Sequence, residues 1–162
     1  MKTTLILLIN LVFTTILMGQ TTVSIADIQT LDNTSWTGNL MYINYLDGQP
    51  VNLRTTMQIE IKANQIIMRT QFTDEPGANS KSSIKLKKGG SYFGSEKITE
   101  RTKLKDGTLK IVTTFKGKDD NKSASMFKIY LIGENDFSIT KTVIFENSQE
   151  QLVRNRYTYL KV

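Results

Sequence analysis

A lysine interrupts an apolar strand pattern near the C-terminal end of this 162-residue chain. The stretch FSITKTVIF runs from Phe137 to Phe145, and its apolar residues alternate with polar ones. Side chains two residues apart in a strand point to the same face. Lys141 shares the parity of the apolar row, so the pattern puts an ammonium group on the face predicted to be buried. Such a group can anchor a ligand's acidic head, pair with a carboxylate, or extend toward water.

A carboxylate and the last strand are the other candidates for this chemistry. Glu100 lies between Ile98 and Thr102 on a face predicted to be buried, where it can pair with Lys141. The final stretch, LVRNRYTYLKV, carries cations and tyrosines that a neighbouring strand would bring close to Lys141.

Two registers are open for this last strand. If Phe145 pairs with Leu152, Lys141 faces Arg156 and Val143 faces Arg154, which gathers cations that need an anion as a partner. If the loop differs by one residue, Lys141 faces Tyr157 and Ile139 faces Tyr159, which gives a neutral wall with one amine. Both registers place a polar anchor in an apolar cavity. The candidate ligand-binding residues are Lys141, Glu100, Arg154, Arg156 and Tyr157, with Tyr42, Met57, Met68 and Phe72 as cavity lining or ordinary core.

The composition removes several chemistries. The chain has no His and no Cys, which excludes a Ser-His-Asp triad, a cysteine nucleophile, a usual zinc site and a His-ligated haem. We therefore expect no metal and no cofactor, and a protein that is not an enzyme. The remaining catalytic alternative is a cofactor-free lyase or isomerase in which Glu100, Lys141 and Tyr157 converge as acid and base.

The N-terminus predicts export. Residues 1–19 combine Lys2, an apolar run and a terminal Gly19, which is typical of a secretory signal peptide. We expect a secreted protein, periplasmic or extracellular, with a lead-in segment over residues 20–35 and one domain over residues 36–162. Ser24 and Asp27 are spaced as a capping pair for a short helical turn in the lead-in.

After Trp36 the chain alternates with a period of two. A turn at Asp47-Gly48 pairs Trp36 with Ile59 and Tyr42 with Leu53, and a turn at Ala63-Asn64 pairs Ile59 with Met68. A third turn at Asp106-Gly107 pairs Thr102 with Ile111. The first two hairpins put their apolar residues on one shared face. The outward face of the third carries Lys97, Arg101, Lys103, Lys105, Lys110 and Lys116.

The fold class follows from these hairpins. Eight to ten sequential antiparallel strands without a crossover helix predict an all-β protein, a single up-and-down barrel with a short N-terminal helical turn. Closure removes both sheet edges. Six basic residues on one outward face exclude a lipid-facing outer-membrane barrel, since a lysine at the bilayer midplane costs roughly 2–4 kcal/mol. A two-sheet sandwich is the alternative.

The stretch SWTGNLMYINYLDG and the Arg-rich last strand resemble the lipocalin-like, or calycin, barrels, over residues 33–162. The resemblance implies that Trp36 is structural, with Arg154 or Arg156 packed over it to close the floor. It also implies a cup that binds a small apolar molecule. Thr34 stands where lipocalins usually carry Gly, which favours a lipocalin-like family of small exported bacterial proteins.

The expected function is the binding of a small hydrophobic ligand, with or without an acidic group, in the barrel interior. A partner-binding or surface-binding barrel with a filled core is a further alternative. The net charge of +6 allows weak contact with anionic surfaces. We expect no nucleic acid partner, because the basic stripe lacks interleaved aromatic residues, and a protein that is not embedded in a membrane. The stripe comprises Lys85, Lys87, Lys97, Arg101, Lys103 and Lys110.

Overall fold

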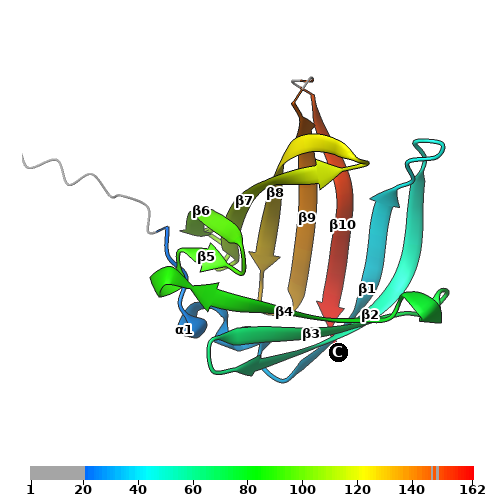
Figure 1. Cartoon of the computed structure of the whole chain (residues 1–162). Helices are drawn as coiled ribbons and strands as arrows, with labels where there is room; N and C mark the ends of the chain where they lie inside the picture. The colour runs from blue at the N-terminus through cyan, green and yellow to red at the C-terminus, as the bar shows by residue number, and fades with distance from the viewer. Residues whose placement is uncertain (1–20, 147, 149) are drawn as a thin grey trace, which may run out of the picture.

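Ten antiparallel strands follow one another along the chain and close into a barrel, because the first pairs with both the second and the last (Figure 1). The computed structural model describes residues 21–146, 148 and 150–162, so the predicted signal peptide, residues 1–19, lies outside the described residues. The predicted all-β up-and-down barrel is confirmed. Its elements are α1 (Ile25–Ile28), η1 (Gln29–Leu31), β1 (Thr34–Ile43), β2 (Pro50–Lys62), β3 (Gln65–Phe72), η2 (Pro76–Ala78), β4 (Ser80–Lys87), η3 (Lys88–Gly90), β5 (Tyr92–Phe93), β6 (Glu96–Lys103), β7 (Leu109–Asp119), β8 (Lys122–Ile132), β9 (Asp136–Phe145) and β10 (Gln151–Lys161).

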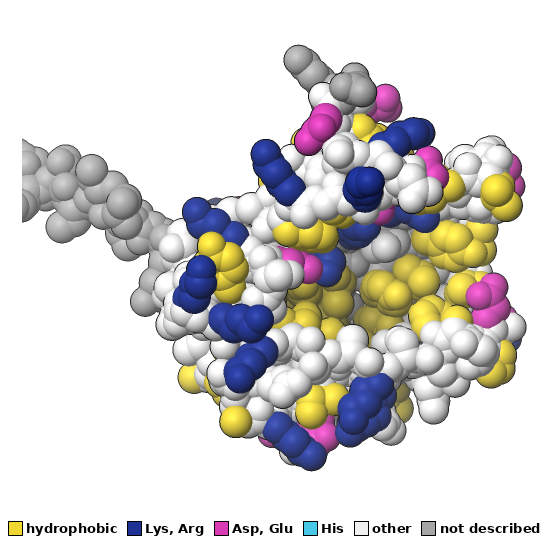
Figure 2. Space-filling model, viewed as in Figure 1, with side chains coloured by type: hydrophobic (Ala, Val, Ile, Leu, Met, Phe, Trp, Pro, Cys, Tyr) yellow, Lys and Arg dark blue, Asp and Glu magenta, His cyan; other side chains and the backbone are white. Residues whose placement is uncertain are grey.

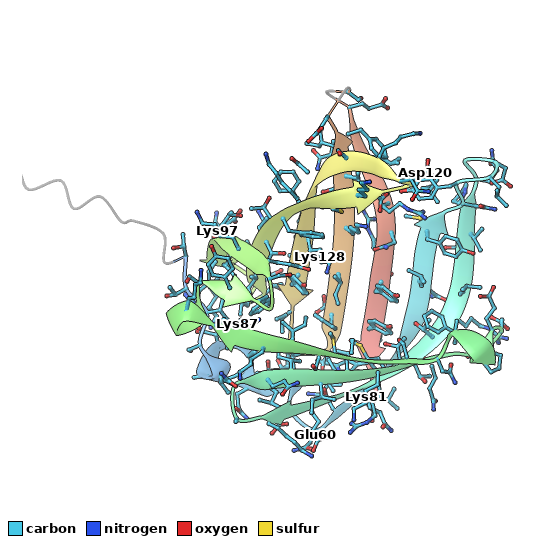
Figure 3. All side chains as sticks on the ribbon, in the orientation of Figure 1. Glu60, Lys81, Lys87, Lys97, Asp120 and Lys128 are labelled. Carbon is cyan, nitrogen blue, oxygen red and sulfur yellow. The ribbon has the colours of Figure 1, made fainter. Side chains whose placement is uncertain are left out.

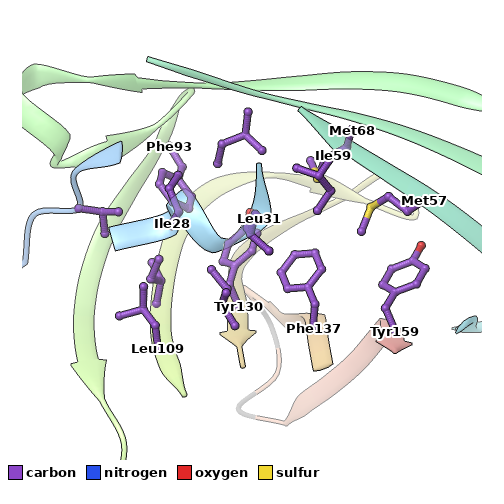
Figure 4. Close-up of a cluster of buried hydrophobic side chains, with 14 of the residues drawn as sticks. Ile28, Leu31, Met57, Ile59, Met68, Phe93, Leu109, Tyr130, Phe137 and Tyr159 are labelled. Carbon is purple, nitrogen blue, oxygen red and sulfur yellow. The ribbon is translucent and has the colours of Figure 1, made fainter. Parts of the chain in front are cut away.

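The short helices α1 and η1 close one end of the barrel. Asp27 caps the first turn as the sequence predicts, since its carboxylate accepts hydrogen bonds from the backbone N–H and the hydroxyl of Ser24. Ile28 and Leu31 point from these helices into the core, among residues from opposite walls such as Phe93 and Phe137 (Figure 4). A void of only about 10 Å³ is left between them. This closed end is therefore a packed core.

Trp36 sits at the closed end and is 1% exposed. Its indole Nε1 donates to Thr34 Oγ1 at 2.7 Å, and its ring lies 5.9 Å from that of Phe137. The cation over the indole is Lys161, at 5.9 Å from the ring centroid. The expectation that Arg154 or Arg156 covers this ring is wrong. β10 runs toward the end of the barrel that α1 and η1 close, so only its last residues reach Trp36.

The first two hairpins keep the predicted faces. The pairing of β2 with β3 is as predicted, with Ile59 opposite Met68 around a turn at Ala63-Asn64. The pairing of β1 with β2 differs by two residues, so Trp36 lies opposite Met57 and not Ile59. The connection spans residues 44–49 rather than a two-residue turn. A shift of two residues preserves the inward face, and the apolar row stays inside.

A bulge in β6 reverses the predicted face of Glu100. The register shifts between Ile98 and Glu100, so Ile98 faces the interior opposite Thr113 while Glu100 lies opposite the outward Val112. Glu100 pairs with Lys110 on the exterior at 3.0 Å. The bulge also turns Arg101 inward, opposite the fully buried Ile111. The predictions for Glu100 and Arg101 are therefore both wrong. So are the pairing of Thr102 with Ile111 and the outward face of Lys103, because Thr102 lies opposite Lys110 and Lys103 opposite the buried Leu109.

A second bulge, in β10, replaces both predicted registers. Leu152 lies opposite Val143, the register shifts between Val153 and Asn155, and beyond the shift Asn155 lies opposite Lys141. Tyr157 and Tyr159 then face inward opposite Ile139 and Phe137.

The barrel wall has a side opening between β4 and β7. Residues 80–85 of β4 pair with β3 alone, and only Leu86 and Lys87 pair with β5. Residues 115–119 of β7 pair with β8 alone, because the pairing of β6 begins opposite Thr114. Figure 2 shows a hollow at this place, with hydrophobic side chains inside it. The opening gives access to the interior above the packed core.

Candidate functional site

The side opening leads to a cavity of about 340 Å³ inside the barrel. One part of its wall is apolar, with side chains from β3, β4, β7 and β9, and another part is polar, with side chains from β8, β9 and β10. The lining residues are Met68, Ile84, Phe115, Lys128, Tyr130, Ile139, Lys141, Asn155 and Tyr157. A pocket with a mainly apolar wall and a few convergent polar groups is typical of small-molecule sites.

Lys141 points into the barrel and pairs with Asp119. Its Nζ lies 2.7 Å from Asp119 Oδ1, and Arg154 Nε lies 3.6 Å from Asp119 Oδ2. All three side chains are largely buried. Arg154 also donates to the carbonyl of Ile43 and stacks 3.6 Å above the ring of Tyr45. Arg154 therefore fastens β10 to the loop after β1, while Lys141 faces the cavity.

A second ion pair lies beside the first. Lys128 Nζ donates to Glu96 Oε1, and Thr113 Oγ1 donates to Glu96 Oε2 at 2.7 Å. Burial raises the pKa of Tyr130, and the carboxylate of Glu96 raises it further, so this phenol stays neutral and able to donate. Lys128 and Lys141 lie directly opposite each other on β8 and β9. Two ammonium groups thus share one patch of the cavity wall.

These ammonium groups keep unused donors. An ammonium has three N–H bonds. Among the described residues Lys141 donates to Asp119 alone and Lys128 to Glu96 alone. No hydrogen bond from the side chain of Asn155 or the hydroxyl of Tyr157 is formed within the described part of the chain, and burial raises the pKa of Tyr157. The polar wall can therefore donate several hydrogen bonds to acceptor oxygens in the cavity.

The structure brings together only part of the predicted site. Lys141, Tyr157 and Met68 line the cavity. Tyr42 and Phe72 pack with Leu40 at the open end.

The other candidates lie elsewhere. Met57 belongs to the packed core. Arg156 is exposed on the outer face, where its Nε donates to Thr140 Oγ1, and Glu100 lies outside as well. The predicted catalytic set of Glu100, Lys141 and Tyr157 is therefore not assembled.

Sequence reasoning missed Asp119, Glu96 and Lys128. The signal for Asp119 was present, because Leu109, Ile111 and Phe115 share its parity along one strand. That parity continues to the last residue of β7, because the turn that follows is only Asp120 and Asn121, both with positive φ. Lys128 shares the parity of Met126 and Tyr130 and could have been found in the same way.

A larger hollow lies on the outside of the barrel. It measures about 650 Å³ and extends over β1, β2, β9 and β10. Its outward side chains are mostly hydroxyl groups of Thr37, Thr56, Ser138 and Thr158. Arg54, whose ion pair with Asp74 is exposed, also lines it. The interior cavity instead has two largely buried ion pairs beside an apolar wall, so it is the better candidate site.

The fold and the cavity define a closed ten-stranded antiparallel barrel with an amphipathic side cavity. No protein-family model matches the sequence, and no curated protein or solved structure matches it. Helices in the described residues are all too short to span a bilayer. In the same part of the chain no group of three or more acidic side chains is placed to hold a metal ion.

Proposed function

We propose that this protein is an exported, non-catalytic carrier that takes a small amphipathic molecule, an apolar body with an acidic head group, into the side cavity. The observation that carries the proposal is the juxtaposition of Lys128 and Lys141 in a cavity whose remaining wall is mostly apolar. The ammonium groups suit a carboxylate, and Ile84, Phe115 and Ile139 suit a hydrocarbon chain.

The charge balance of the interior favours an acidic head group. Lys128, Lys141 and Arg154 are matched only by Glu96 and Asp119, so the cations exceed the carboxylates by one. A partly buried charge without full compensation is unfavourable. A ligand carboxylate between the two lysines would supply the missing anion and accept their unused N–H bonds.

The size of the cavity favours a compact ligand. Ligand pockets range from about 300 to 1,000 Å³, and this cavity, at about 340 Å³, lies near the lower limit. A medium-chain fatty acid fits this range better than a long-chain one. The packed closed end prevents a longer chain from extending past Tyr130 and Phe137.

The test is binding of decanoate and decanol, measured by calorimetry and by thermal shift. We expect decanoate to raise the melting temperature by about 5–10 °C at a concentration 100-fold above its Kd. Lys141→Met should weaken decanoate binding at least tenfold and leave decanol nearly unchanged. The matched control is Lys62→Met, since Lys62 is exposed on β2 and pairs with Glu60 on the outside. Absence of binding by acids of any chain length would refute the proposal.

A further inference from the structure

Cations without a salt-bridge partner are concentrated on one side of this barrel. Among the residues that the structure describes, every Lys or Arg outside an ion pair lies between residues 81 and 118, apart from Arg156 and Lys161. The three acidic residues of the same segment offset them little, because Glu96 lies inside the barrel, Glu100 pairs with Lys110, and Asp106 lies in the turn between β6 and β7. This side therefore has a strongly positive surface.

Five of these lysines frame the side opening, and we refer to them as the rim lysines. They face outward from β4, β6 and β7, and all are exposed. They are Lys81, Lys85, Lys97, Lys116 and Lys118. In Figure 2 basic side chains lie along the left, upper and lower borders of the hollow, and Figure 3 labels Lys81 and Lys97 on the strands around it, with Lys128 inside. The positive surface and the access to the cavity thus coincide.

Protection of open strand edges explains only part of this arrangement. Lysines on an unpaired edge hinder edge-to-edge aggregation, and Lys81, Lys85, Lys116 and Lys118 lie on such edges. Lys97 does not, because β6 pairs with β5 on one side and with β7 on the other. Like charges repel one another, so an anionic partner would stabilise the whole set.

We propose that the rim lysines dock the protein on an anionic lipid surface, with the side opening turned toward the bilayer. Basic side chains near such a surface are attracted by its negative potential, and the attraction falls off within about 10 Å at moderate salt. A lipid surface suits this site better than a nucleic acid, because the lysines frame an opening to an apolar cavity. Tyr92 lies opposite Lys97 on the outer face, but a stacking surface for single-stranded nucleic acid uses a series of aromatic side chains.

Docking is independent of binding inside the barrel. If the carrier function proposed above is correct, this orientation would let an amphipathic ligand pass between the bilayer and the cavity without crossing bulk water. Docking requires only the outer lysines, however, whereas Lys128 and Lys141 are held inside the barrel by Glu96 and Asp119. One function can therefore fail while the other holds.

The test is co-sedimentation of the purified protein with vesicles of phosphatidylcholine alone or with about 30% phosphatidylglycerol. We expect binding only to the anionic vesicles, and release when salt rises from about 0.1 M to about 1 M. Lys81→Glu with Lys116→Glu should lower the affinity at least tenfold. The matched control is Lys103→Glu with Lys105→Glu, which changes the net charge equally. Lys103 lies beside α1 and η1 at the closed end, so this variant should lower the affinity less than threefold.

The outcomes separate the alternatives. An equal loss of vesicle affinity in the two double variants would overturn the proposed orientation of the side opening toward the bilayer, because it would show that net charge alone attracts the protein. Absence of binding to anionic vesicles would overturn docking itself, and binding to heparin or single-stranded DNA without binding to vesicles would assign the surface to a polymer. Circular dichroism and a thermal melting curve check that each variant folds. If the variant with Lys81→Glu and Lys116→Glu does not fold, Lys97→Glu alone replaces it, and we expect it to lower the vesicle affinity about threefold.

Discussion

Asp119 and Lys141 form an ion pair inside the barrel although β8 separates their strands. The Lys141 ammonium lies 2.7 Å from Asp119 Oδ1, and Asp119 Oδ2 is buried without a hydrogen-bond donor within the described residues. The ion pair explains why an amine is tolerated in an apolar row. It also leaves the cavity with a lysine whose remaining N–H bonds are free to bind a ligand.

Replacing Asp119 should affect stability and binding in opposite directions. Asp119→Asn leaves Lys141 without its partner, so the free energy of unfolding should fall by about 1–3 kcal/mol. Decanoate should bind more tightly, because Asp119 no longer competes for the ammonium. Urea unfolding and calorimetry measure the two effects. Asp120→Asn is the control, since Asp120 is exposed in the adjacent turn, and equal effects of both variants would contradict the assigned role.

The pair of Asp27 and Arg101 should make the closure by α1 sensitive to acid. Burial alone would raise the pKa of Asp27, but the bonds from Arg101 and Ser24 outweigh it and hold the pKa below the usual 3.8. Because the pKa of Asp27 is lower in the folded protein than in the unfolded chain, the ionised carboxylate stabilises the folded state above pH 3.8. This stability is lost as the pH falls through the folded-state pKa. Asp27→Asn should therefore cost about 1–2 kcal/mol at pH 7 and progressively less below pH 3.8.

The measurement is urea unfolding of both proteins across the acid range. Glu75→Gln removes one exposed negative charge from the loop before η2 and serves as the control. A destabilisation by Asp27→Asn that stays constant down to the acid transition would show that the charge of Asp27 plays no part.

Trp36 should be the most costly single residue to remove from the closed end. Trp36→Ala should lower the free energy of unfolding by about 3–5 kcal/mol, because it leaves a cavity beside Phe137. Trp36→Phe should cost less, since it keeps an aromatic ring there and loses mainly the hydrogen bond to Thr34. Circular dichroism is the appropriate probe, because Trp36 is the only tryptophan. Equal costs for the two substitutions would contradict this assignment.

Gly38 sets how closely β1 approaches β10. A Cβ atom at Gly38 would lie 1.9 Å from the backbone oxygen of Thr158, so Gly38→Ala must push the two closing strands apart. We expect a loss of about 2–3 kcal/mol, in the upper part of the range for overpacking. Gly77→Ala is the control, because a Cβ atom there meets open space. A thermal denaturation series in which both variants melt like the wild type would contradict the close approach.

The sequence was informative where strands are regular. Alternation from Trp36 onward predicted the all-β barrel, the buried indole and the inward Lys141, because a period of two survives even a two-residue error in register. The β2–β3 pairing was predicted residue by residue, since the short turn at Ala63-Asn64 leaves no freedom in the register.

The rest depended on irregularities that alternation does not encode. A bulge adds one residue to one strand and reverses every face beyond it. This happened at Thr99, which moved Glu100 outside, and at Arg154, which brought Asn155 into the cavity. The partner of Lys141 was missed for a different reason, because Asp119 and Lys141 lie on strands that do not pair and meet only through the curvature of the closed sheet.

The gap between β4 and β7 means that the amides and carbonyls along its two borders already lack strand partners. Widening the gap along these unpaired borders therefore breaks no ladder hydrogen bonds. For the proposed carrier, a ligand would then enter and leave through the gap without any part of the sheet losing its hydrogen bonds.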